Sequence, residues 1–253
     1  MGEVRESDGP RERVAGAVAS ARENAADAVA SARESAGEAI ARVKPRFRGR
    51  SHEWAFFLSL GLGIALISAA DGARATAAAA IYAVSLSALL GVSALYHRID
   101  WKRPEIRRLM RRLDHTMIFF LIAGTVTPFA LLVMNPPFAT ALLVAVWAGA
   151  IAGTVVELIW IDAPKWVTTL VYLAVGWIGA LGFPAIWIEA GIGAGILIAI
   201  GGALYTAGAV VYARQSPDPR PATFGYHEIF HVLVIAAAAL HFGAVAFYAL
   251  PAA

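Results

Sequence analysis

Long apolar stretches alternate with short polar ones over most of this chain. Seven stretches are each about 20 residues long, the length that an α-helix needs to cross a bilayer. We place them near residues 54–70, 75–97, 114–134, 139–161, 166–184, 190–212 and 227–250. Because every backbone polar group in a bilayer must be paired within the protein, this pattern predicts an all-α fold, a polytopic bundle of seven transmembrane helices.

Turn-forming residues separate most of these stretches. The sequences at the clearest breaks are DGAR at 71–74, NPP at 135–137, DAPK at 162–165 and SPDP at 216–219. Asp, Asn, Gly and Pro are typical of turns, since each favours backbone conformations that end a helix. The break between the fifth and sixth stretches, near Pro184, has the weakest signal.

The N-terminal segment differs from the rest of the chain in charge and in pattern. Residues 1–53 hold ten of the 21 basic and nine of the 18 acidic residues. The heptapeptide AVASARE occurs at 17–23 and again at 28–34. This period of eleven residues fits a nearly straight helix. We expect residues 1–45 to form a cytoplasmic amphipathic repeat tail, helical or disordered, and residues 46–253 to form the membrane domain. Contact of the tail with lipid or with itself is the functional alternative.

Composition supports a membrane protein and excludes a soluble globule. The chain is 59% hydrophobic and 15% charged, against roughly 25% charged residues in a soluble domain. No signal peptide is visible, because the first 45 residues are charged and lack an apolar core. With no cysteine, a bound metal would need histidine, carboxylate or water as its ligands.

The distribution of Lys and Arg predicts the orientation in the cell membrane. The connection 98–113 holds seven of them, the segment before the first span is basic, and 213–226 holds two more. The connections on the opposite side of the membrane hold a single Lys or Arg, Arg74. Because basic loops stay in the cytoplasm, the N-terminus is predicted to be cytoplasmic and the C-terminus extracytoplasmic.

In this orientation four ionisable residues lie in the inner-leaflet half of their spans. His97 ends the second span, Asp114 begins the third, and His227 and His231 begin the seventh. Ionisable groups inside a membrane are costly and usually face the bundle interior, so they are functional candidates. His227 and His231 stand one turn apart on one helix face.

These residue types point to a catalytic metal site. Three imidazoles, from His97, His227 and His231, match a zinc site that keeps its fourth position for water. Asp114 could orient or deprotonate that water. Ser93, one turn before His97, could hydrogen-bond an oxyanion or the aspartate. A histidine at the end of a span can also be an ordinary interfacial side chain.

The remaining ionisable residues have simpler interpretations. His115 lies about 100° around the helix from Asp114 and is expected to point elsewhere. His52 falls outside the first predicted span and is expected at the interface. His241 would lie about 15 Å deeper than His231, too far to share its ion. Glu157 is expected to extend its carboxylate toward water.

Three motifs together resemble the hemolysin III family. They are SALYH at 93–97, RRLDHTMIFFLIAGTVTPF at 111–129 and HEIFHVLVIAAAALHF at 227–242, and the resemblance covers about residues 46–250. The family belongs to the progestin and adipoQ receptor superfamily, which includes the adiponectin receptors. The sequence departs from the family at Arg50-Ser51-His52, where Thr-His is common, and this puts a role for His52 in doubt.

The resemblance implies seven helices around a zinc ion near the cytoplasmic face. By position its ligands would be His97, His227 and His231, with Asp114 against the zinc-bound water and Ser93 behind it. Alkaline ceramidases are similar to this superfamily, and ceramide hydrolysis has been proposed for the receptors. Haemolysis and control of membrane fluidity have been suggested for bacterial members.

The sequence HEIFH also matches the zinc-protease motif His-Glu-x-x-His. In a protease Glu228 would be the base that activates water. An intramembrane metalloprotease should also carry a ligand aspartate in a motif on another span, and the sequence has none. We therefore interpret the match as incidental, since the family pattern needs only the two histidines.

The sequence leaves three functions open. The first is a zinc-dependent integral membrane hydrolase that acts on a lipid amide or ester, with membrane lipids as substrate and no nucleic acid as partner. The second is a receptor-like membrane sensor or fluidity regulator with structural zinc. The third is a pore-forming haemolysin, which a bundle with a filled polar core does not favour.

Overall fold

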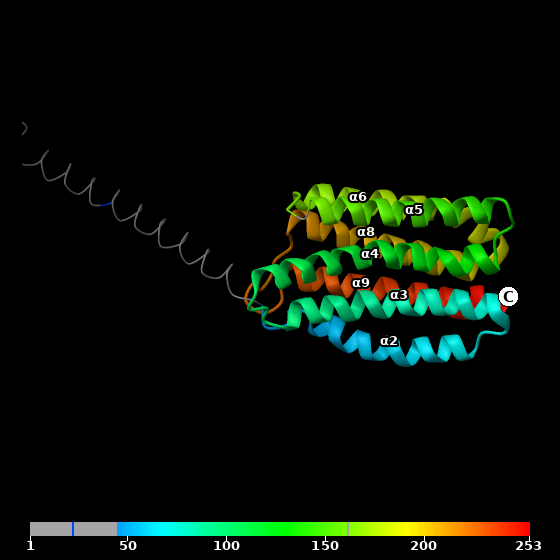
Figure 1. The fold of residues 1–253 in the computed structure, drawn as a ribbon, viewed down its shortest axis with the longest axis horizontal. Coiled ribbons are helices and arrows are strands. Elements are labelled where there is room, and N and C mark those ends of the chain that lie inside the picture. The colour runs from blue at the N-terminus through cyan, green and yellow to red at the C-terminus, as the bar shows by residue number, and fades with distance from the viewer. Residues whose placement is uncertain (1–21, 23–44, 161) are drawn as a thin grey trace, which may run out of the picture. The chain divides into compact units, whose positions relative to one another are not determined.

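The computed structural model describes Arg22, residues 45–160 and residues 162–253. The predicted tail at 1–45 therefore lies outside the described residues, except for Arg22 and Pro45. From Pro45 onward the chain forms one compact unit, a bundle of long helices that share one axis (Figure 1).

The bundle is all-α over the described residues, as the hydrophobic pattern predicts. Its long helices are α2 (Arg50–Ser68), α3 (Gly72–Arg98), α4 (Pro104–Leu132), α5 (Phe138–Ile159), α6 (Lys165–Ala180), α8 (Ile192–Arg214) and α9 (Tyr226–Ala244). Between α6 and α8 lie the short helix α7 (Phe183–Ala185) and the π-helical segment η1 (Ile186–Ala190). Beyond α9 the chain continues as a π-helical segment, η2 (Val245–Ala249), and a 3-10 turn, η3 (Leu250–Ala252).

Six of the described helices are long and apolar enough to cross a membrane. The expected span at 166–184 is a broken one, because α6 ends at Ala180 and the pair α7–η1 follows at an angle of 41°. Counting α6 and the following α7–η1 segment together as one bent span gives seven spans. Pro184 sits in the first turn of α7, where a missing backbone N–H is tolerated.

Helix α4 begins well before the residue expected from hydropathy. Its first residue is Pro104 rather than residue 114, so most of the basic segment 98–113 is helix and not loop. Proline is favoured in the first turn of a helix, and Arg and Glu are good helix formers. The connection between α3 and α4 is therefore limited to residues 99–103.

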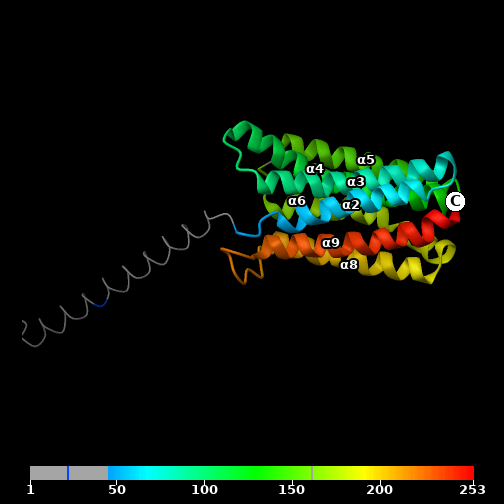
Figure 2. The same ribbon diagram turned by 90° about the horizontal axis from the view of Figure 1, so that it is seen from below.

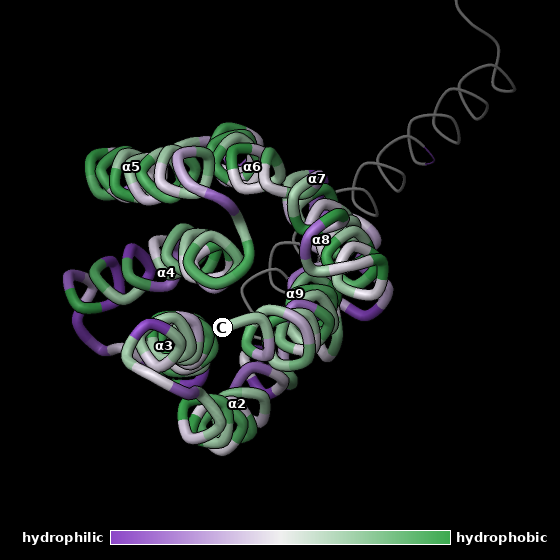
Figure 3. The backbone as a smooth tube through the Cα atoms, turned by 90° about the vertical axis from the view of Figure 1, so that its right-hand side faces the viewer, coloured by the Kyte–Doolittle hydropathy of each residue, from purple (hydrophilic) through white to green (hydrophobic). Residues whose placement is uncertain are grey.

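The long helices follow one another around the bundle in chain order. Each contacts the next, and α9 contacts α2 to close the ring, as the end-on view shows (Figure 3). Figure 2 shows α8 beside α9 and α2 beside α3. Large apolar side chains such as Trp54, Ile64 and Phe247 are exposed on the outside. This apolar exterior is typical of an integral membrane protein.

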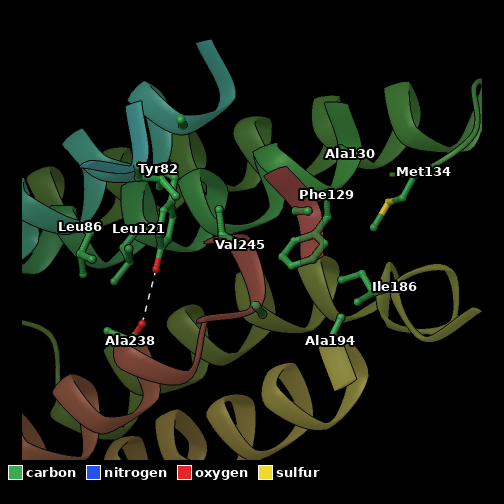
Figure 4. Packing of buried hydrophobic residues seen from close by; sticks show 14 of the residues in the cluster. Tyr82, Leu86, Leu121, Phe129, Ala130, Met134, Ile186, Ala194, Ala238 and Val245 are labelled. Carbon is green, nitrogen blue, oxygen red and sulfur yellow. Dashed lines mark hydrogen bonds between the residues drawn. The ribbon is translucent and has the colours of Figure 1, made fainter. Parts of the chain in front are cut away.

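Aromatic and small side chains fill the interior. Phe129 and Tyr82 are fully buried, and the Tyr82 hydroxyl donates to the Ala238 carbonyl at 3.5 Å (Figure 4). Ala78 and Ala79 of α3 are also fully buried; such small residues let transmembrane helices approach closely. A bundle filled in this way is not organised around a wide pore.

Candidate metal centre

The four ionisable residues predicted for the site lie at one end of the bundle, which we call the histidine end. Here α3 ends, with His97 in its last turn, and α4 and α9 begin. Asp114 projects from α4, and His227 and His231 from the first turns of α9. Residues four apart share a helix face, so His227 and His231 both turn toward His97.

The three histidines converge closely. One ring nitrogen from each of His97, His227 and His231 lies within 4.8 Å of the others. The Nε2 atoms of His227 and His97 are 3.1 Å apart, and the three pairs of ring centroids are 4.6–5.0 Å apart. Two helices distant in sequence therefore bring three potential ligands to one point.

Asp114 and Ser93 lie beside this group. The Asp114 Oδ2 atom is 3.4 Å from Nε2 of His97. Ser93 is 3% exposed, and its hydroxyl group lies near the same carboxylate. The carboxylate is thus flanked by a histidine of the cluster and by a hydroxyl from one turn earlier on α3.

The arrangement fits a divalent transition-metal ion. Two nitrogen ligands of a tetrahedral zinc ion stand about 3.3 Å apart when each bond is 2.0–2.1 Å, close to the 3.1 Å between His97 and His227. Imidazole suits Zn, Cu, Fe and Ni, so the donor set fits this class of ion.

His52 also belongs to this region, and the expectation that it lies at the interface is wrong. Its side chain is 2% exposed, and its ring stacks on that of His231 with centroids 3.8 Å apart. The reason is that α2 begins at Arg50 rather than at residue 54, so His52 lies within the helix. The glycine at position 49 could have indicated this earlier start, because it adopts φ +78° just before the helix.

Glu228 has a structural role at the start of α9. Its Oε1 atom accepts a bond from Nε of Arg48 at 2.5 Å, and Oε2 accepts one from the Gly225 N–H at 2.8 Å. The carboxylate thereby caps the helix. Both oxygens have partners, which agrees with the interpretation of His-Glu-x-x-His as incidental.

His115 and Glu157 form a separate pair between α4 and α5. Nδ1 of His115 contacts Oε1 of Glu157, and Glu157 is only 3% exposed. The expectation that Glu157 extends toward water is therefore wrong, because α5 turns this residue inward to a histidine that hydropathy alone does not reveal. As expected, His115 is not one of the three converging histidines.

His241 does not join the group, again as expected. It lies deeper along α9, where its Nε2 atom is 3.2 Å from the Ile198 carbonyl oxygen. Its ring packs against Tyr205 with centroids 5.4 Å apart. Both contacts are with α8, so His241 connects two neighbouring helices.

Comparison with known proteins agrees with the motifs. Residues 40–242 match the family model described as Haemolysin-III related. Hemolysin-3 of Bacillus cereus is 33% identical over 182 residues, covering 72% of this chain and 79% of that protein. The Hemolysin-3 homolog of Bacillus subtilis (strain 168) is 32% identical over 170 residues, covering 66% and 75%. Monocyte to macrophage differentiation factor of Homo sapiens is 29% identical over 168 residues, covering 65% and 67%. The chain therefore belongs to the haemolysin III-related family of integral membrane proteins.

Proposed function

We propose that this protein is a zinc-dependent membrane hydrolase that cleaves a lipid amide or ester. The observation that carries the proposal is the convergence of three histidine nitrogens next to the carboxylate of Asp114. Three protein ligands leave a position open at a zinc ion, which is typical of catalytic rather than structural sites.

His97, His227 and His231 would hold the ion, because one ring nitrogen from each lies within 4.8 Å of the other two. When bound, zinc supplies a Lewis acid that polarises a carbonyl group and brings the pKa of water down to about 7. Among the ions that imidazole suits, we propose zinc, because it has no redox chemistry and hydrolysis requires no change of oxidation state.

Asp114 is the proposed proton acceptor. Its Oδ2 atom faces the histidine cluster and can take the proton from the attacking water. The oxygen of that water bonds to the carbonyl carbon as the C–N or C–O bond breaks, and the proton passes from Asp114 to the leaving amine or alcohol. The hydroxyl group of Ser93, which lies near this carboxylate, would help to hold it in place. The products are a fatty acid and an amine or an alcohol.

Membrane lipids are the proposed substrates. The outer face of the bundle is lined by large exposed apolar side chains, so the lipid bilayer is the medium next to the protein. A bilayer lipid with an amide or ester near its headgroup places the scissile bond near the depth of a helix end. The histidine cluster lies at such an end.

The proposed orientation puts the histidine end at the cytoplasmic face of the plasma membrane. The short connection at 99–103 and the start of α4 are rich in Lys and Arg, and such segments remain in the cytoplasm. The C-terminus at Ala253 lies at the opposite end of the bundle (Figure 1) and would be extracytoplasmic.

The direct test is a lipidomic assay of the purified protein. The protein is incubated with mixed membrane lipids after removal of metal by a chelator, and again after addition of zinc. We expect fatty acid to be released only with zinc present. A protein that binds one zinc per chain and releases no fatty acid from any lipid would instead support the receptor-like sensor or fluidity regulator with structural zinc.

A further inference from the structure

Gly49 and the first turn of α2 that follows it contact the histidine cluster at two points. Gly49 adopts φ +78°, and a Cβ atom built there would lie 2.6 Å from Cβ of His97. The chain can therefore pass His97 only because residue 49 has no side chain. One turn later, His52 lies against His231. A helix that supplies none of the three converging nitrogens thus touches two of the residues that do.

The contact between His52 and His231 is a parallel stack. The two ring planes differ by 10° and their centroids are 3.8 Å apart. The rings of His97, His227 and Phe230 instead meet His231 at 60°, 63° and 53°. Among the described residues, His52 is therefore the ring that covers a face of His231.

This geometry makes His52 a poor candidate for a fourth ligand. Imidazole binds a metal through a nitrogen lone pair that lies in the plane of the ring. Since the planes of His52 and His231 are nearly parallel and stacked, their lone pairs point into separate planes. They cannot converge on one ion as those of His97, His227 and His231 can.

We propose that His52 is a positioning residue that fixes the orientation of the His231 ring. Most metal-binding histidines are oriented by a hydrogen bond to the second ring nitrogen. Nδ1 of His231 makes no such bond to any described residue, so packing must orient this ring. The proposal rests on metal binding by the three histidines in the proposed function.

The segment before α2 is itself anchored to the segment before α9 and to the first turn of α9. The N–H groups of Arg46 and Phe47 donate to the carbonyls of Ala222 and Thr223 at 3.1 and 3.2 Å. The ion pair of Arg48 with Glu228 adds a side-chain connection beside them. These contacts hold the segment before α2 next to the start of α9, which keeps His52 over His231.

The test compares His52→Ala with His52→Phe in the purified, full-length protein. Zinc affinity is measured by competition with a chelator and without lipid. Truncation to Ala removes the stack and should weaken zinc binding about 10–100-fold, the usual cost of losing an orienting partner. Phe keeps a flat ring without nitrogens and should stay near the wild-type affinity. His241→Ala, which also removes a buried imidazole from the bundle, should leave the affinity unchanged.

Two results would overturn the proposal. Wild-type affinity in His52→Ala would show that the stack does not orient His231. A loss in His52→Phe equal to that in His52→Ala would show that the nitrogens of His52, and not its flat ring, are needed. Absence of zinc from the wild type would refute the proposed function itself. A zinc-loaded wild type that cleaves no lipid leaves the positioning role standing.

Discussion

His231 and His241 are two buried histidines on the same helix with different surroundings. His231 is 1% and His241 9% exposed, and each has an Nδ1 atom without a hydrogen-bond partner among the described residues. His231 is surrounded by the rings of His52, His97 and His227. His241 has a carbonyl and a tyrosine of α8 as its neighbours.

The comparison shows that burial of a histidine does not by itself make a site. A single imidazole in a membrane bundle can hydrogen-bond to one carbonyl of a neighbouring helix, as His241 does at Ile198, and then contributes to helix packing. A metal site needs several donors at one point. At the histidine end α3 and α9 provide them, and α2 covers the face of one.

The largest expected effect is on metal content. Purified wild-type protein should contain about one zinc per chain, because three imidazoles form one site. His97→Ala, His227→Ala and His231→Ala should each lose most of it, while His241→Ala should keep it. Elemental analysis of the purified variants measures this. Full zinc content in His97→Ala would show that the site is not the one described.

The next effect is on catalysis and concerns Asp114. Asp114→Asn keeps the size of the side chain and one acceptor oxygen, but it cannot take a proton. General-base assistance is worth about 10²–10⁴-fold in rate, so the rate of fatty acid release should fall by that factor. Loss of this neighbour can also weaken zinc binding by about 10–100-fold, so the assay needs zinc in excess.

Glu228→Gln is the matched control for that variant. Glu228 has the same charge and also lies at the histidine end, but its oxygens are engaged by Arg48 and Gly225. The Glu228→Gln variant should lose far less activity than the Asp114→Asn variant. Equal rates in wild type and Asp114→Asn would contradict the mechanism. A severe loss confined to Glu228→Gln would favour the protease-like assignment of the base.

The smallest perturbation is a topology reporter, which places His231 and His241 relative to the two faces of the membrane. A reporter inserted at 99–103 should be cytoplasmic, and one fused after Ala253 should be extracytoplasmic, because of the basic residues near the α3–α4 connection. The opposite result would put the His231 cluster at the outer face and His241 nearer the cytoplasm.

The sequence by itself determined the features that depend on local spacing. The length of the apolar stretches predicts the helices, because the bilayer thickness sets how long a span must be. The spacing of His227 and His231 places both on one face of α9. The polarity of the connections and the direction of successive spans put His97 and Asp114 at the same end, and the structure brings all four together.

Only the tertiary structure decided which neighbours the remaining polar residues meet. His52 stacks on His231 across 179 positions of sequence, and Glu157 finds His115 on a neighbouring helix. Hydropathy placed both residues toward water, because it measures the cost of burying a polar group alone. That cost falls when another helix supplies a partner or a flat ring at the same depth. Which helix does so depends on how the bundle closes, and here the contact of α2 with α9 closes it.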